Sequence, residues 1–174
     1  MTNLLHKEEA YVWTDKHQSA FNKLKTAVCS APTLLTPDPA LPYTVMTDSS
    51  GFAIGAALHQ NHGRGLQPIA FMSKKMKPAE RNYPVHEQEE LAIIHALKEW
   101  RHYLHGELPF TVITDHHSLT TLFDKPTQST RQARWMNDIL AEFKNLMTIM
   151  YKAGETNVVA DALSRRPDHK EEEE

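Results

Sequence analysis

Apolar and polar residues alternate along this chain with two different spacings. Short runs of β-branched and apolar residues between Gly, Asn and Pro predict strands, and apolar residues three or four positions apart predict helices. The strand pattern occurs at 43–48, 52–60, 66–73, 110–115 and 146–151. The helical pattern occurs at 11–30, 85–104, 117–123, 129–143 and 157–165.

This order of elements predicts an α/β fold with one mixed sheet flanked by helices. The first three strands follow one another through short turns at Gly51 and 61–65, which is typical of an antiparallel meander. A long helix separates the fourth strand from the first, so a right-handed crossover can make these two strands parallel neighbours. Four prolines between 31 and 42 exclude a regular helix there. We therefore expect an N-terminal segment, 1–40, and a main domain, 41–166.

Composition narrows the class of protein. The 174 residues are 40% hydrophobic and 24% charged, as in ordinary globular domains. No apolar run approaches the roughly 20 residues that span a bilayer, and the N-terminus lacks the apolar core of a signal peptide, so we expect no membrane partner. The single Cys29 excludes an internal disulfide and fits an intracellular location. The charged residues 167–174 are expected to be a disordered acidic tail.

Two of the predicted strands end in an aspartate. Asp48 follows Val-Met-Thr and precedes Ser-Ser-Gly, and Asp115 follows Val-Ile-Thr. Taken alone, each aspartate is well explained as a turn-capping residue. Together, at the ends of two strands expected to be parallel neighbours, they predict two carboxylates at one edge of one sheet.

Two further acids join this pair. On a helical projection of 85–104 the apolar positions share one face, with Glu89 near its middle, Glu90 at its flank and Glu87 on the far side. Glu89 is therefore expected to point inward, although pairing with a lysine would also explain a partly buried acid. Asp161 lies inside the last predicted helix.

Four converging carboxylates would need bound cations. Two carboxylates about 4 Å apart repel by roughly 4 kcal/mol at an effective dielectric near 20, and a cluster of four would raise its own pKa values. Oxygen ligands select Mg²⁺ or Mn²⁺ rather than zinc. Four carboxylates balance two divalent ions, which is the two-metal arrangement for in-line phosphodiester hydrolysis.

The sequence closely resembles the ribonuclease H domain of the reverse transcriptase polyprotein of gypsy-type LTR retrotransposons. The matching motifs lie at 47–56, 83–84, 87–92, 100–104, 114–116, 134–135 and 154–165. Each motif alone is weak, but together and in this order they are specific, and the resemblance covers nearly everything from Trp13 to Arg166. The segment around 13–32 resembles the connection that joins the polymerase to the ribonuclease H domain.

The resemblance implies a ribonuclease H-like fold with a five-stranded mixed sheet, three antiparallel strands plus two parallel ones, and an N-terminal helical extension. It implies cleavage of the RNA strand of RNA–DNA hybrids with two Mg²⁺ ions, for which Mn²⁺ substitutes. Asp48 would bridge both metals, Glu89 and Asp115 would hold the metal on the leaving-group side, and Asp161 would hold the metal that activates water. The partner would be the polymerase domain of the same polyprotein, in the cytoplasm or a virus-like particle.

Substrate contacts are expected from donors after the first strand, from basic side chains and from residues beside the acids. These candidates are Ser49, Ser50, Gly51, Lys74, Lys75, His116, Arg134, Asn157 and Arg165. Because the net charge is −3, nucleic acid would bind through a local basic stripe; an ordinary solvated surface explains any one of these basic residues equally well. His116 and His117 also suggest a zinc site, but no thiolate partner accompanies them.

One departure and two alternatives remain. Many relatives carry a mobile histidine in the loop before the last acid, and residues 150–157 contain none, so histidine-assisted proton transfer or product release stays open. The alternatives to a nuclease are a non-catalytic connection, scaffold or domesticated nucleic-acid-binding module of the same fold, and a transposase or integrase that cuts DNA. The unbroken set of acids favours the ribonuclease.

Overall fold

The computed structural model describes residues 11–29, 34–124, 129–153, 157–166 and 169. The chain divides into two compact units, Met1–Thr33 and Leu34–Glu174. In the smaller unit, α1 (Asp15–Cys29) begins four residues later than the helix expected from Tyr11. Its first turn is closed by the amide of Gln18, which donates to the carbonyl of Thr14 at 3.0 Å. The acidic tail lies outside the described residues, apart from His169.

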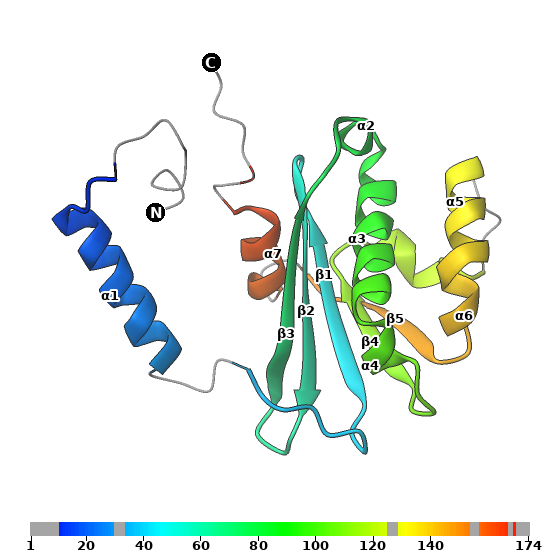
Figure 1. The fold of residues 1–174 in the computed structure, drawn as a ribbon. Coiled ribbons are helices and arrows are strands. Elements are labelled where there is room, and N and C mark those ends of the chain that lie inside the picture. The colour runs from blue at the N-terminus through cyan, green and yellow to red at the C-terminus, as the bar shows by residue number, and fades with distance from the viewer. Residues whose placement is uncertain (1–10, 30–33, 125–128, 154–156, 167–168, 170–174) are drawn as a thin grey trace. The chain divides into compact units, whose positions relative to one another are not determined.

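The larger unit is built on one five-stranded sheet (Figure 1). Its strands are β1 (Tyr43–Ser49), β2 (Ala53–Asn61), β3 (Leu66–Lys75), β4 (Phe110–Thr114) and β5 (Met147–Tyr151). The order is β3-β2-β1-β4-β5, with antiparallel pairing among the first three strands along the chain and parallel pairing of β1 with β4 and of β4 with β5. The expected mixed sheet is therefore confirmed.

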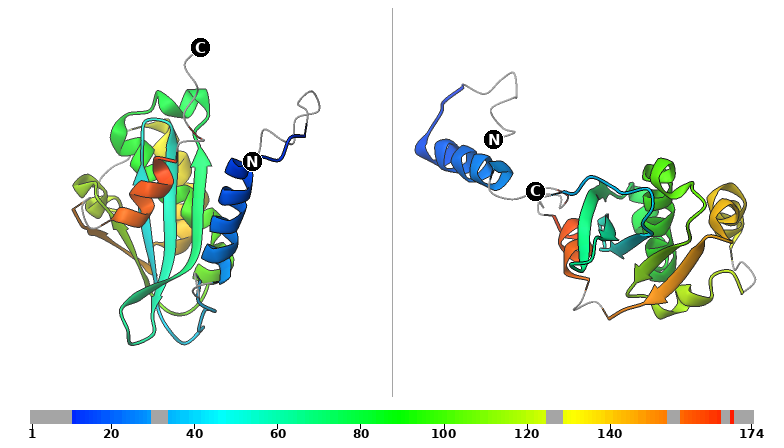
Figure 2. Two further views of the ribbon diagram at one scale, coloured as in Figure 1. Left: turned by 90° about the vertical axis from the view of Figure 1, so that its left-hand side faces the viewer. Right: turned by 90° about the horizontal axis from the view of Figure 1, so that it is seen from below.

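The helices cover both faces of this sheet. They are α2 (Pro78–Arg81), α3 (Val85–Glu99), α4 (Arg101–Leu104), α5 (Thr130–Trp135), α6 (Ala141–Phe143) and α7 (Val158–Ser164), with a 3₁₀ turn η2 (His117–Thr121) and a π turn η3 (Met136–Leu140). Figure 2 shows α7 on one side of the sheet and α3 with α5 on the other. Among the described residues, no helix is long and apolar enough to cross a membrane.

Two expected helices are interrupted. The helix expected over 85–104 divides at Trp100, whose φ of −104° and ψ of 20° end α3 before α4 begins. The helix expected over 129–143 contains the π turn η3 between α5 and α6. Ser129 starts this second helix, since its hydroxyl accepts a hydrogen bond from the amide of Gln132 at 3.1 Å.

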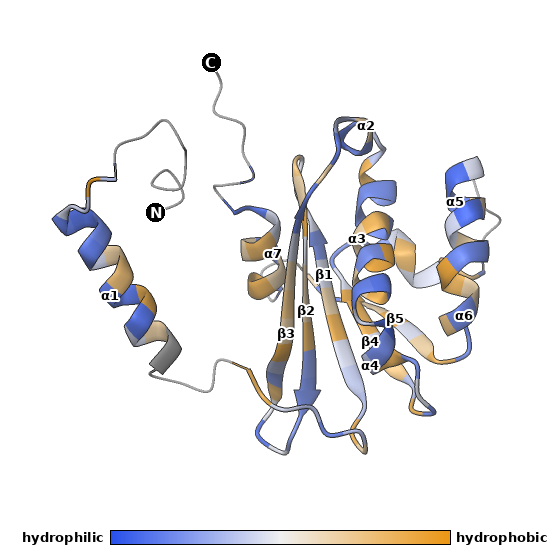
Figure 3. Cartoon of the chain, viewed as in Figure 1, coloured by the Kyte–Doolittle hydropathy of each residue, from blue (hydrophilic) through white to orange (hydrophobic). Residues whose placement is uncertain are grey.

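The main hydrophobic core lies between α3, the η3–α6 segment and the sheet. Val45, Leu58, Ile93 and Leu97 have no exposed surface, and Phe143 meets Phe110 edge to face at 5.6 Å between ring centroids. Figure 3 shows the apolar residues along the strands and interspersed with polar ones along α3. Because helices cover both faces, β2 is buried over eight of its nine residues.

The expected outward position of Glu87 is wrong. Glu87, Glu89 and Glu90 are all buried, with exposed fractions of 3%, 5% and 0%. The helical projection assumed that only the sheet covers α3, but α5 also packs against it. From α5, Arg131 pairs with Glu87 and Gln132 donates to Glu90 at 2.9 Å. An acidic side chain on the apparent polar face is therefore enclosed by a second helix.

Candidate metal site

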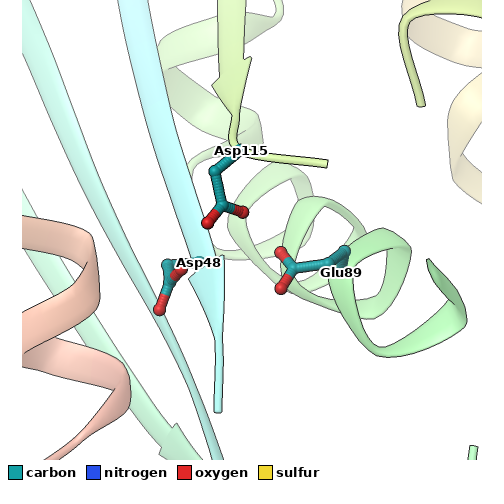
Figure 4. A group of neighbouring side chains, drawn as sticks. All are labelled: Asp48, Glu89 and Asp115. Atoms are coloured by element: carbon teal, nitrogen blue, oxygen red, sulfur yellow. The ribbon is translucent and has the colours of Figure 1, made fainter. Parts of the chain in front are cut away.

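Three separate elements bring three carboxylates to one edge of the sheet. Asp48 lies near the end of β1, Asp115 directly follows β4, and Glu89 lies in the N-terminal part of α3. Because β1 and β4 are parallel neighbours, with Met46 opposite Ile113, their carboxyl ends meet at this edge. One oxygen from each of the three carboxylates lies within 4.8 Å of the other two (Figure 4). This spacing and donor set suit a single divalent cation.

Among the described residues, the hydrogen bonds that hold Glu89 in place all reach one of its oxygens. The Ser49 hydroxyl donates to Glu89 Oε1 at 2.6 Å, and the Ser49 amide donates to the same oxygen at 3.2 Å. Glu89 Oε2 is buried without a hydrogen-bond partner among the described residues. A buried carboxylate oxygen without a partner is unfavourable, so the arrangement favours a site that a cation completes.

Burial dominates the protonation of Glu89. It raises the pKa of this carboxyl to about 8; the Ser49 hydroxyl opposes the rise, and the negative charges of Asp48 and Asp115 add to it. A cation among the carboxylates would lower the pKa again, because positive charge favours the ionised form.

Asp48 is the more enclosed of the two aspartates. It is 4% exposed, and burial raises its pKa to about 6. The Ser164 hydroxyl opposes this rise by donating to Asp48 Oδ2 at 2.5 Å, while Asp115 and then Asp161 raise the pKa further. Asp48 therefore stands between the β4 side and the α7 side of the site.

Asp161 lies outside the group of three carboxylates. Its side chain is 43% exposed and pairs with Arg165 one turn later on α7. Its charge nevertheless reaches Asp48, whose pKa it raises. The structure thus brings together three of the four expected acids and places the fourth at the margin of the site, neutralised by a neighbouring guanidinium.

The backbone of β2 allows α7 to approach the sheet closely. A Cβ atom at Gly55 would lie 2.3 Å from the carbonyl oxygen of Ala160 and 2.5 Å from the amide of Ser164, distances that real Cβ atoms do not reach. Only glycine fits at this crossing. Gly55 thereby sets the distance at which α7 presents Asp161 and Ser164 to Asp48.

Two of the expected substrate contacts are engaged inside the protein. Ser50 is 7% exposed, and its hydroxyl donates to the Ser164 carbonyl at 2.6 Å. Asn157 is 1% exposed, and its side-chain amide donates to the Thr47 carbonyl at 2.8 Å. Both side chains tie α7 to the end of β1, so they support the site from within.

The remaining expected contacts are more accessible. Gly51, Lys74, Lys75, Arg134 and Arg165 are exposed, whereas Ser49 and His116 are partly buried. The ammonium of Lys74 lies 3.2 Å from Nδ1 of His95, and Nδ1 of His116 lies 2.8 Å from the Ser118 hydroxyl. The two lysines extend β3 beyond the strand end expected at Ser73.

Sequence reasoning missed Ser164 and Gly55. Ser164 follows Asp161 by three positions, so a helix places both side chains on neighbouring parts of one face; that spacing was the available signal. Gly55 carried a partial signal, because a glycine inside a strand indicates a close approach without naming the partner.

Comparisons with known proteins bear on the family and the fold. The family profile described as "RNase H-like domain found in reverse transcriptase" matches residues 13–112. The Tf2-3 and Tf2-4 transposon polyproteins of Schizosaccharomyces pombe are each 37% identical to this chain over 175 residues, which cover 98% of the chain and 13% of each polyprotein. The chain therefore spans about an eighth of the length of the curated relatives it matches.

Solved structures share the fold at low sequence identity. A foamy viral protease-reverse transcriptase in complex with double-stranded DNA aligns with a TM-score of 0.58 at 20% identity, covering 85% of this chain and 28% of that one. RNase H1 from Halobacterium salinarum aligns with a TM-score of 0.51 at 17% identity, covering 71% and 92%. LC11-RNase H1, solved in complex with an RNA/DNA hybrid, aligns with a TM-score of 0.55 at 13% identity, covering 71% and 92%.

Proposed function

Since this chain belongs to the RNase H-like domain family of reverse transcriptases, in the branch of gypsy-type LTR retrotransposons, we propose that it hydrolyses the RNA strand of RNA–DNA hybrids in a metal-dependent reaction. One observation carries the proposal: Asp48, Glu89 and Asp115 place carboxylate oxygens within 4.8 Å of one another although they come from different elements. A purely structural module has no use for such mutual repulsion.

The donor set fits Mg²⁺, with Mn²⁺ as a substitute, because all three ligands are carboxylates and the chain has a single cysteine, Cys29. The buried Glu89 Oε2 atom, which has no partner among the described residues, supports this fit. Asp48, Glu89 and Asp115 would hold the ion. When bound, this ion would stabilise the negative charge that develops on the leaving group and the scissile phosphate.

The proposal assigns Asp161 to a second ion shared with Asp48. Arg165 now neutralises Asp161, and Asp161 is half-exposed at the margin of the site, where a substrate phosphate can compete for the guanidinium. Arg165 would then contact the substrate once it leaves the aspartate. Arg165 would thus exchange its ion pair with Asp161 for an ion pair with a substrate phosphate.

Recognition of the hybrid is proposed to rest on shape and backbone charge. Lys74, Lys75 and Arg134 are exposed and are assigned to phosphates, contacts that carry no base sequence. Ser49, Gly51 and His116 lie close in sequence to Asp48 or Asp115 and are assigned to the sugar edge, where the 2′-hydroxyl distinguishes RNA from DNA. Ser50 and Asn157 act indirectly, through α7.

The domain is proposed to work within a longer polyprotein. Residues 41–166 would be the nuclease, and 1–40 would connect it to a polymerase domain that precedes it. We expect the intact protein in the cytoplasm or in a virus-like particle. These assignments extend to this chain what its matches to transposon polyproteins suggest.

The test is a cleavage assay with a labelled RNA–DNA hybrid and a titration of Mg²⁺ or Mn²⁺. We expect the wild type to release products with 5′-phosphate and 3′-hydroxyl ends. Asp48→Asn should abolish cleavage, and Asp138→Asn, which changes an exposed acid on η3, should not.

Three outcomes would contradict the proposal. Undiminished cleavage by Asp48→Asn would show that the reaction does not require the Asp48 carboxylate. Hybrid binding without turnover at any concentration of either metal would favour a non-catalytic module. Equal cleavage of duplex DNA would favour a transposase or integrase.

A further inference from the structure

We infer that Ser164 is a positioning residue that fixes the Asp48 carboxylate for cation binding and couples it to the helix that carries Asp161. The inference rests on the proposed metal-dependent function. Ser164 has no exposed surface, so it cannot touch a substrate and acts only through its neighbours. Its hydroxyl lies 2.5 Å from Asp48 Oδ2, which leaves the second oxygen of this carboxylate for a cation.

The Ser164 hydroxyl has two possible acceptors. Besides Asp48, the carbonyl oxygen of Asp161 lies 2.9 Å away, which is the usual local bond of a serine within a helix. That carbonyl already accepts the amide of Arg165 at 3.0 Å. The carboxylate is the closer acceptor, and hydrogen bonds to ionised acceptors are about twice as strong as neutral ones. The proton of the hydroxyl therefore belongs on the bond to Asp48.

Ser164 itself is held firmly enough to position another group. The Ser50 hydroxyl donates to its carbonyl at 2.6 Å, and its amide lies over Gly55, where no Cβ fits. Its main chain is thus fixed from two sides, by the end of β1 and by β2. A displacement of the Ser164 main chain would therefore require movement of α7.

If Ser164 had a purely structural role, its hydroxyl would make one of several hydrogen bonds that hold α7 against the sheet. Ser73 offers the matched comparison, since its hydroxyl donates to the neighbouring Leu163 carbonyl at 2.6 Å. Ser73→Ala removes this bond between the sheet and α7, together with the 2.8 Å contact of the Ser73 hydroxyl to Nε2 of His169, but does not affect a carboxylate. The two alanine variants therefore separate docking from positioning.

The experiment measures Mg²⁺ and Mn²⁺ binding by calorimetry on the whole chain without nucleic acid, together with melting temperatures. We expect Ser164→Ala to weaken cation affinity by about 10- to 100-fold, the usual effect of removing a partner of a metal ligand. Ser73→Ala should change it by less than about threefold, since the Ser73 hydroxyl donates to a main-chain carbonyl and not to a proposed metal ligand. Ser164→Cys keeps a donor, although a weaker one on a larger atom, and its cation affinity should fall between those of wild type and Ser164→Ala. If the alanine variant folds poorly, Ser164→Cys alone should still bind cations more weakly than wild type.

Hybrid cleavage adds a second readout. Ser164→Ala should lower kcat with little change in KM, because a buried hydroxyl contributes nothing to substrate binding. Cation affinity within threefold of wild type in Ser164→Ala, or equal losses in Ser164→Ala and Ser73→Ala, would overturn the inference. A wild type that binds cations but leaves the hybrid intact would instead overturn only the proposed function.

Discussion

At the scale of single residues, the site depends on which of the adjacent buried acids faces the aspartates. Glu89 and Glu90 are consecutive on α3, and both are buried. Each has one oxygen without a hydrogen-bond partner among the described residues. Only Glu89 has its carboxylate beside Asp48 and Asp115; Glu90 instead accepts a hydrogen bond from Gln132. Burial alone therefore does not define the site.

Glu89→Gln is expected to reduce cation affinity and hybrid cleavage by at least about 10- to 100-fold. This is the usual loss when a hydrogen-bond partner of a metal ligand is removed, and loss of the ligand itself should cost no less. Glu90→Gln, the matched control, should leave both within about threefold, because its carboxyl lies on the α5 side of the helix. Calorimetric titration of Mg²⁺ and a single-turnover assay measure the two effects. Equal losses in both variants would mean that the helix as a whole, rather than Glu89, had been disturbed.

The raised carboxyl pKa values predict an unusual pH dependence of stability. In the folded protein the pKa of Asp48 is about 6 and that of Glu89 about 8, so between pH 4.5 and 8 the folded state binds more protons than the unfolded state. Stability of the metal-free protein therefore falls as pH rises through this window and is highest below it as far as these two groups are concerned.

The measurement is the melting temperature of the metal-free protein between about pH 7 and 8.5, above the range in which the lowered pKa of His95 makes stability rise with pH. We expect it to fall with rising pH, to fall less in Glu89→Gln, and to recover on addition of millimolar Mg²⁺, because the cation favours the ionised carboxylates. A metal-free melting temperature that rises over the same window in wild type, with no response to Mg²⁺, would contradict the assignment of these groups.

At the scale of elements, the site is the meeting point of two parallel strand ends with one helix on each face of the sheet. The strands place Asp48 and Asp115 through their register alone. The helices contribute through different contacts: α3 through the bond between Ser49 and Glu89, and α7 through close backbone packing on Gly55. The position of α7 is thus set by its packing on β2.

Gly55→Ala is expected to displace α7, since the added methyl group would lie 2.3 Å from the carbonyl oxygen of Ala160. Overpacking of this kind costs about 1–3 kcal/mol, and cleavage should fall with it. Gly106→Ala is the matched control, because a Cβ there meets no atom within 4 Å. Chemical denaturation and cleavage rates compare the two variants; unchanged activity in Gly55→Ala would show that α7 does not set the geometry of the site.

At the scale of the whole molecule, the sequence predicts well the features that depend on local pattern and on the order of the strands. The alternating runs predicted the five strands, and their order placed Asp48 and Asp115 at one edge. The buried position of Glu87 was beyond such reasoning, because it depends on Arg131, 44 residues away on α5. The pairing of Asp161 with Arg165 was different, because their spacing of four positions in the predicted helix was an available signal that the search for acids did not use.

The last whole-molecule property is charge, which is −3 overall and therefore gives no general attraction to nucleic acid. Binding of a hybrid must then rely on a few local phosphate contacts, and the salt dependence of its affinity reports their number.

Replacing Lys74 and Lys75 together by alanine should lower the slope of log affinity against log salt by about 2, roughly one for each phosphate that a lysine no longer neutralises. Lys144→Ala, which changes an exposed lysine just before β5, is the control and should leave the slope unchanged. Fluorescence anisotropy with a catalytically impaired Asp48→Asn background measures the slopes at several salt concentrations. If the double variant kept the wild-type slope, the end of β3 would be an ordinary solvated surface, and the hybrid would have to be held through Arg134 and the carboxylate edge instead.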